Sequence, residues 1–157
     1  MRKPKTLEEV YDSCLAEGFI EEMREVNVDR VKSLTENAET GISTAQIVIK
    51  AISKQAKEWM SVYIGYYEAL RMYAEALLAF DKVRTTNHQC LFALLCTKHP
   101  ELELDWSFFE KVRTKRNGIN YYGERVSYED WKSIEVQMKI YISTLRKEIT
   151  KRLEEGK

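Results

Sequence analysis

The feature that most constrains the fold is an apolar stripe that runs from residue 31 to residue 52. Its members recur at steps of three or four: Val31, Leu34, Ala38, Ile42, Ala45, Ile49 and Ile52. This spacing places all of them on the same face of an α-helix. The stripe therefore predicts one long helix, with Asp29 as its N-cap, that must bury one face against other helices. Gly41 lies within it and weakens it somewhat.

The segment that follows carries the largest side chains of the chain. Its expected buried face consists of Trp59, Tyr63, Tyr66, Leu70, Tyr73 and Leu77. A helix that is apolar over so much of its circumference is expected at the centre of a fold. The number of bulky aromatic residues on several helices exceeds what a small helical core needs. We therefore expect part of this aromatic surface to be buried between subunits.

Start and stop signals delimit the remaining helices. Thr6 and Glu9 form a capping box that opens a helix over about 7–24, with Gly18 as a candidate break. Thr86 or Asn87 is expected to cap a short helix that Pro100 stops. The last two helices are expected to begin after Asp105 and Ser127, and Gly123 is expected to end the first of them. No segment predicts a convincing strand.

These signals predict an all-α protein, an up-and-down bundle of about five or six helices. The 157 residues suit a single domain, 1–157, in which 1–28 form an N-terminal helical extension packed on the bundle. The 25 basic and 25 acidic residues give no net charge, which disfavours a broad nonspecific coat of nucleic acid. A local basic patch is still compatible with this balance.

The cysteine and histidine content disfavours several classes of site. Cys14, Cys90 and Cys96 are scattered and form no CxxC pair, and His88 and His99 are the only histidines. We therefore expect neither a disulfide framework nor a metal site. A reducing cytoplasm is the expected location. There is no phosphate-binding glycine loop or dinucleotide motif, so no cofactor is expected. No apolar run has the length of a membrane span, and the first residues are too polar for a signal peptide.

The segment KVRTKRNGINYYG, residues 111–123, places an arginine on an apolar face. Arg116 shares helical spacing with Phe109, Val112 and Ile119, and arginine is rarely buried unless it is paired. One interpretation is a structural ion pair between Arg116 and a carboxylate of a neighbouring helix. The other is a binding site.

Polar residues surround this arginine in two columns. Arg113, Asn117 and Tyr121 are spaced by four, and Arg116 and Asn120 form the adjacent column. Together they offer guanidinium forks, amide donors and a phenol hydroxyl, a combination that can hold phosphate. Tyr66 could line a pocket beside Arg116, although tyrosines at helical spacing are more often part of a core. The two histidines, taken alone, are more often surface or core residues than ligands.

Several segments together resemble the higher eukaryotes and prokaryotes nucleotide-binding (HEPN) domain family. They are AEGFIEEMREVNVDRVKSLTENAETGISTA, YYEALRMYAEALL, NHQCLFALL and RNGINYYG. The family signature is an arginine, a polar residue directly after it, and a histidine four to six residues later. Arg116 and Asn117 match the first two positions, whereas Tyr121 or Tyr122 stands at the histidine position.

The resemblance implies a helical bundle that dimerises, with the signature helices of two subunits facing each other. Catalytic members of the family are metal-independent endoribonucleases, often toxins paired with a nucleotidyltransferase-like antitoxin. Other members bind RNA, nucleotides or proteins without cutting. By resemblance, Arg116, Asn117, Tyr121 and Tyr122 are the candidate catalytic residues, and Arg113, Asn120 and Tyr66 are candidate ligand-binding residues.

The missing histidine leaves the enzymatic role open. Attack by a 2′-hydroxyl needs a proton acceptor and a proton donor near neutral pH, and histidine suits both roles. Tyrosine, with a pKa near 10, is a poor base at pH 7. The main expectation is thus a homodimer that binds RNA or a nucleotide with weak or no nuclease activity. The alternatives are an active endoribonuclease toxin and a non-catalytic partner of a nucleotidyltransferase-like protein. The toxin needs a proton-transfer group that the sequence does not identify, and Tyr121, Tyr122 and His88 are the residues to test for it.

Overall fold

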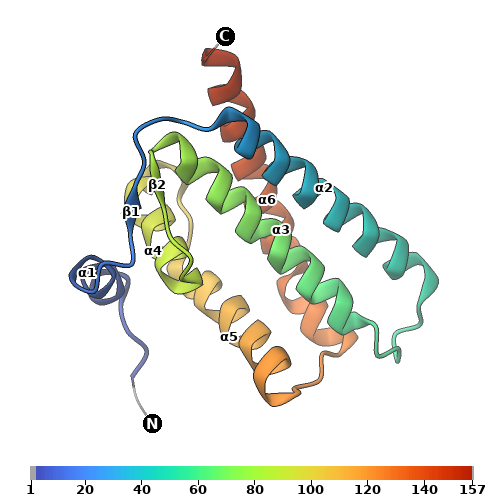
Figure 1. Cartoon of the computed structure of the whole chain (residues 1–157). Helices are drawn as coiled ribbons and strands as arrows, with labels where there is room; N and C mark the ends of the chain where they lie inside the picture. Colours follow the sequence, from blue (N-terminus) through green and yellow to red (C-terminus); the bar gives the residue numbers. More distant parts are fainter. Residues whose placement is uncertain (1–2, 157) are drawn as a thin grey trace.

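A computed structural model describes residues 3–156 and shows a bundle of helices (Figure 1). Its elements are α1 (Leu7–Ala16), β1 (Glu21–Glu22), α2 (Val28–Ala51), α3 (Trp59–Phe80), β2 (Val83–Arg84), α4 (His88–Lys98), the 3-10 helix η1 (Pro100–Leu102), α5 (Trp106–Tyr122) and α6 (Tyr128–Glu155). The predicted all-α class is confirmed, and the number of helices agrees with it. None of the described helices combines the length and the apolarity needed to cross a membrane.

Helix α3 occupies the centre of the bundle, as its sequence predicts. It contacts α2, α4, α5 and α6, and Figure 1 shows it running alongside α2 in front of α6. All six residues of its predicted buried face are at most 4% exposed. Helices α2 and α3 approach closely at two glycines, because a Cβ added to Gly65 would lie 3.6 Å from Cβ of Ala45 and 3.7 Å from the carbonyl oxygen of Gly41. Gly41 therefore marks a close contact between the two helices.

The aromatic residues fill the core of the chain itself. Tyr66 packs on Trp131 of α6 with ring centroids 4.6 Å apart, and Phe92 of α4 stacks on Phe109 of α5 at 4.7 Å. Aromatic pairs at such distances stabilise a core beyond the area they bury. The expectation that a subunit interface buries part of the aromatic surface is therefore wrong for these four residues, because the chain itself buries them.

Most predicted helix boundaries are confirmed by their caps. The side chains of Thr6, Asn87, Asp105 and Ser127 each accept a hydrogen bond from a backbone N–H in the first turn, and Ser127 and Asp130 form a full capping box. Gly123 ends α5 in the left-handed conformation with φ of 64°. The cap of α2 differs from the prediction, because the side chain of Asn27 accepts from the N–H of Arg30 while Asp29 lies in the first turn.

The N-terminal helix is shorter than predicted, and a small strand pair follows it. Helix α1 ends at Ala16, and Gly18 takes φ of 71°, which turns the chain out of the helix. Glu21 and Glu22 then pair antiparallel with Arg84 and Val83. The expectation that the chain has no strand is corrected here: two residues are too few to show the alternation that reveals a strand.

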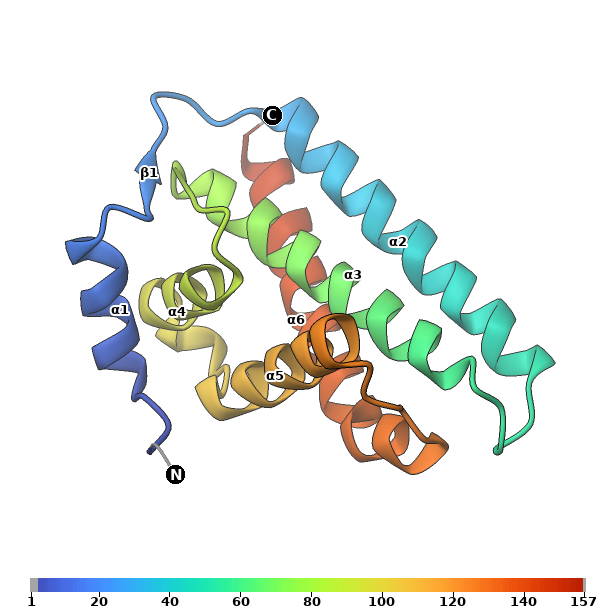
Figure 2. The same ribbon diagram turned by 60° about the horizontal axis from the view of Figure 1, so that its bottom comes forward.

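A disulfide joins Cys14 of α1 to Cys90 of α4, so the expectation of no disulfide is wrong. The two positions are 76 residues apart in sequence, and their Cα atoms lie 5.9 Å apart, within the range that a disulfide spans. With Val10 and Ala93 the two cysteines form a small core of their own. Figure 2 shows α1 beside α4 at the margin of the bundle. Cys96 is a buried free thiol, and burial raises its pKa to about 12.

Candidate functional site around Arg116

Helix α5 places Arg116 on its buried face, as the spacing predicts. Phe109 and Val112 are fully buried and Ile119 is 7% exposed, whereas the side chain of Arg116 is 19% exposed. The three apolar residues fix the rotation of α5 against α3 and α4. Arg116 consequently points toward α3 rather than into solvent.

The guanidinium of Arg116 is held by several weak contacts. Its Nη2 donates to Oε1 of Glu68 at 3.4 Å, and its Nη1 donates to Oδ1 of Asn117 at 3.5 Å. Its Cζ lies 5.6 Å from the centre of the Tyr67 ring, which is a cation–π distance. Its Nε is buried and has no hydrogen-bond partner in the described part of the chain. Both hydrogen bonds are long, so the guanidinium is oriented without being saturated.

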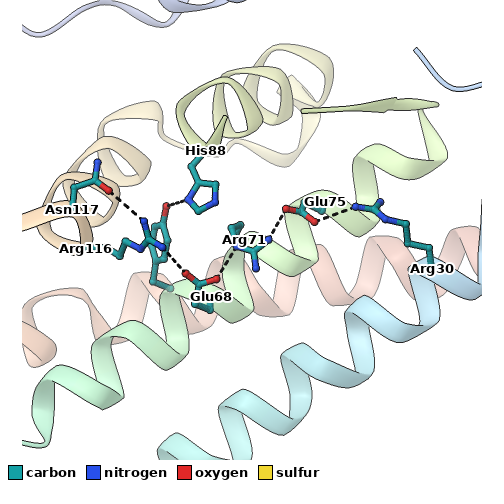
Figure 3. Close-up of polar contacts among 8 residues, drawn as sticks. Arg30, Glu68, Arg71, Glu75, His88, Arg116 and Asn117 are labelled. Carbon is teal, nitrogen blue, oxygen red and sulfur yellow. Dashed lines mark hydrogen bonds and ion pairs between the residues drawn. The ribbon is translucent and has the colours of Figure 1, made fainter. Parts of the chain in front are cut away.

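Glu68 connects Arg116 to a row of alternating charges along α3 (Figure 3). Arg71 donates to Oε2 of Glu68 at 2.7 Å and also to Glu75, which in turn accepts from Arg30 of α2 at 3.3 Å. These side chains are partly buried, between 16% and 36% exposed. The row contains three guanidinium groups and two carboxylates, so it carries a positive excess at the surface of the bundle.

His88, the first residue of α4, lies next to this row. Its Nδ1 shares a hydrogen bond of 3.1 Å with the hydroxyl of Tyr67, whose ring lies under Arg116. Burial, followed by the charges of Arg71 and Arg116, lowers the pKa of His88 below its usual 6.5. Burial raises the pKa of Tyr67, so its phenol stays protonated. A neutral imidazole therefore lies beside the arginine at neutral pH.

The other polar residues predicted on α5 have separate surroundings. Arg113 is paired with Glu110 at 3.0 Å, and Glu110 also accepts from Gln89 of α4 at 3.1 Å. Asn117 contacts Arg116, as described above, and Asn120 is exposed. Arg116 and Asn117 are thus brought together, while Arg113 is engaged in its own ion pair.

The three candidate tyrosines lie in opposite environments. Tyr121 and Tyr122 are 72% and 83% exposed at the end of α5. Tyr66 is 1% exposed, packs against Trp131, and its buried hydroxyl has no partner in residues 3–156. The structure therefore places Tyr66 in the core, where a ligand cannot reach it without rearrangement, and Tyr121 and Tyr122 on the surface.

Five residues of the site were not among the sequence candidates: Arg30, Tyr67, Glu68, Arg71 and Glu75. A signal for three of them exists, because Glu68, Arg71 and Glu75 follow steps of three and four within an otherwise apolar helix. Such a polar row on a central helix indicates either a structural charge network or a site. The position of His88 beside Arg116 had no local signal, since the two lie on different helices.

No protein-family model, no curated protein and no solved structure matches the chain. Within residues 3–156, no group of three or more histidine, cysteine, aspartate or glutamate side chains is arranged to hold a metal ion.

Proposed function

We propose that the protein binds RNA or a nucleotide through Arg116, in a HEPN-like homodimer. The observation that carries this proposal is the state of Arg116: a guanidinium on a buried seam, held by two long hydrogen bonds, with an unpartnered Nε. A structural arginine in such a place is expected to make short bidentate contacts to its carboxylate. An arginine that is oriented but unsaturated is suited to a ligand oxygen.

Phosphate is the ligand that this arrangement favours. The planar guanidinium fork matches two phosphate oxygens, and Asn117 holds one of its nitrogens in place. Arg71 adds a second positive charge on the neighbouring helix, 2.7 Å from the carboxylate that Arg116 also contacts. A phosphate that replaces Glu68 at Arg116 leaves Glu68 still paired with Arg71.

His88 supports the second candidate function, a metal-independent endoribonuclease. It is a neutral imidazole linked through Tyr67 to the arginine, so it supplies the proton-transfer group that the tyrosines at the signature position lack. In this candidate, the 2′-hydroxyl attacks the adjacent phosphorus and loses its proton to a base, while the 5′-oxygen leaves and takes up a proton. The products are a 2′,3′-cyclic phosphate and a 5′-hydroxyl.

A homodimer or a protein partner remains part of the proposal through the family resemblance. The exposed Tyr121 and Tyr122 are the large aromatic residues that such a contact would use, at the end of the helix that carries Arg116. A nucleotidyltransferase-like antitoxin is the alternative partner. Light scattering of the purified protein distinguishes a monomer from a dimer. By the family resemblance, Tyr121 or Tyr122 is the residue that such an antitoxin would modify, and an unchanged intact mass after co-expression counts against this modification.

The test of the function uses a 5′-labelled single-stranded RNA in EDTA, with binding and cleavage measured on the same samples. Arg116→Ala is expected to weaken binding by about tenfold or more, the loss typical of one charge-assisted contact. Arg24→Ala is the matched control, because Arg24 is exposed and makes no ion pair within residues 3–156. His88→Asn is expected to abolish any cleavage and to leave binding within about twofold.

Two outcomes decide against the proposal. If Arg116→Ala and Arg24→Ala reduce RNA binding equally, Arg116 is not the binding residue. If Arg116→Ala unfolds the protein, Arg116→Lys keeps the charge and the fold but removes the bidentate fork. Unchanged RNA affinity in a folded Arg116→Lys variant then identifies Arg116 as structural.

A further inference from the structure

A cavity lies on the side of α5 that faces away from Glu68. It has a volume of about 720 Å³ and is bounded by the N-terminal segment Pro4–Thr6, by α5, by the start of α6 and by Tyr63 of α3. We call it the α5–α6 cavity. Its size is in the range of sites that hold small organic molecules. Arg116 does not line it, so it is a separate site that does not depend on the function proposed above.

The three carboxylates at this cavity are opposed by two cations. Glu110 is paired with Arg113 at 3.0 Å. Glu124 and Asp130 both lie near Lys115, with Nζ to oxygen distances of 3.6 and 3.8 Å. Three carboxylates opposed by two cations leave one negative charge at the wall.

Two lysines in the same wall have no carboxylate partner in the described part of the chain, and an indole ring lines the wall with them. Lys5 and Lys111 line the cavity and form no ion pair with any residue in 3–156. The Nε1 of Trp106 donates to the carbonyl oxygen of Lys5 at 3.4 Å, which holds the N-terminal segment against α5 and leaves the ring at the cavity. With the one negative charge left over, the two lysines give the wall a net charge of +1, and they line the cavity together with a flat aromatic ring.

The side chain of Tyr63, which also lines this cavity, has a hydroxyl without a hydrogen-bond partner in the described part of the chain. This hydroxyl is buried, and buried hydroxyls normally have such a partner. Burial, and then the charge of Asp130, raise the pKa of Tyr63, so the hydroxyl stays protonated and can act as a donor. Tyr63 and Asp130 both line the cavity. Like the hydroxyl of Tyr66, that of Tyr63 is out of reach of a bound molecule until side chains of the wall move, and a ligand that moves them would satisfy it.

We propose that the α5–α6 cavity binds a small organic anion that has a flat aromatic ring. The negative group lies at Lys111 and Lys5, and the ring lies against Trp106. An aromatic carboxylate and a nucleotide monophosphate share this chemistry. The two are separated by the probes in the experiment below.

The experiment follows the indole N–H signals of the three tryptophans by NMR during titration with 2-naphthoate and, separately, with adenosine monophosphate. Trp106→Phe identifies the Trp106 signal; Trp59 and Trp131 are buried outside the cavity. The Trp106 signal is expected to move saturably with at least one probe, and the probe that moves it identifies the anion class. Uncharged 2-naphthylmethanol and adenosine are expected to bind about tenfold more weakly than the matching anions.

Charge reversal at the cavity gives the decisive comparison. Lys111→Glu is expected to raise the dissociation constant by about tenfold, because it places a negative charge beside the anion. Lys147→Glu is the matched control, an exposed lysine of α6 outside the cavity. Arg116→Ala is expected to leave this titration unchanged even if it abolishes RNA binding, which separates the two sites.

Three results would overturn the proposal. The first is a Trp106 signal that neither probe moves. The second is equal affinity for the charged and uncharged members of a pair. The third is equal affinity in Lys111→Glu and Lys147→Glu. Both lysines are exposed, so both variants are expected to fold, and dispersion of the indole signals checks this in the same spectra.

Discussion

Oε1 of Glu68 lies 3.4 Å from Nη2 of Arg116, so the protein supplies an internal carboxylate to the arginine that we propose as its phosphate ligand. A carboxylate and a phosphate compete for the same guanidinium fork. The ion pair is long and only partly buried, with side chains 19% and 27% exposed, so a phosphate can displace it at modest cost.

Glu68→Gln should therefore strengthen RNA binding, whereas Arg116→Ala weakens it. Removing the competing charge is expected to raise affinity by about threefold to tenfold, which corresponds to about 1 kcal/mol. Filter binding or fluorescence anisotropy with single-stranded RNA measures the change. Glu135→Gln is the control, since Glu135 is also paired with two cations, Lys132 and Lys139, but on α6. Weaker binding by Glu68→Gln would show that Glu68 positions Arg116 and does not compete for it.

The pKa of His88 should lie below 6.5 and should rise when a neighbouring arginine is removed. Burial is the main cause of the lowering, and Arg71 is the next. Arg71→Gln is expected to raise the pKa measured from the imidazole proton shifts by NMR. Because the folded-state pKa is lowered, the stability that His88 contributes is present above about pH 6.5 and is lost as the pH falls through the folded pKa. A pKa above 6.5 in the wild type would contradict the burial of His88 beside the arginines.

His99 should show the opposite dependence on pH. Its Nε2 lies 2.6 Å from Asp81 and its Nδ1 lies 3.1 Å from Glu101, and these carboxylates, Asp81 first, raise the pKa of His99. Its contribution to stability is therefore complete below about pH 6.5 and is lost as the pH rises through the folded pKa. His99→Gln is expected to cost about 1–2 kcal/mol near pH 5.5 and less near pH 9. Urea unfolding at both pH values measures the difference, and a constant cost would refute the prediction.

The disulfide between Cys14 and Cys90 should make a large contribution to stability. It closes a loop with a sequence separation of 76, for which the chain-entropy estimate is about 4 kcal/mol. Urea unfolding with and without a reductant measures this contribution, and Cys14→Ser should reproduce the effect of the reductant. Thiol titration of the unfolded, unreduced protein should give one free thiol, that of Cys96. Three free thiols in that sample would mean that the bond does not form.

Tyr66→Phe should leave RNA affinity unchanged and should not destabilise the fold. Tyr66 is buried against Trp131, and its hydroxyl has no partner within residues 3–156, so the substitution removes a buried polar group that is not satisfied. The expected gain in the free energy of unfolding is zero to about 1 kcal/mol. Thermal unfolding and RNA binding are both measured. A loss of RNA affinity with unchanged stability would return Tyr66 to the binding site.

Local signals in the sequence determined the helices and most of their ends. A helix begins where a side chain can satisfy its first N–H groups, and Thr6, Asn87, Asp105 and Ser127 do so over three residues or fewer. The helical period also placed Arg116 on a buried face. These features depend on neighbours in sequence, so spacing alone reveals them.

Only the tertiary structure decided which residues from different helices meet. The pairing of Glu68 with Arg116, the position of His88 beside Tyr67 and the bond between Cys14 and Cys90 each join separate elements. Helical spacing gives the face on which a residue lies, but not the rotation and offset of one helix against another. Those two quantities come from the packing of the whole core, which fixes partners far apart in sequence.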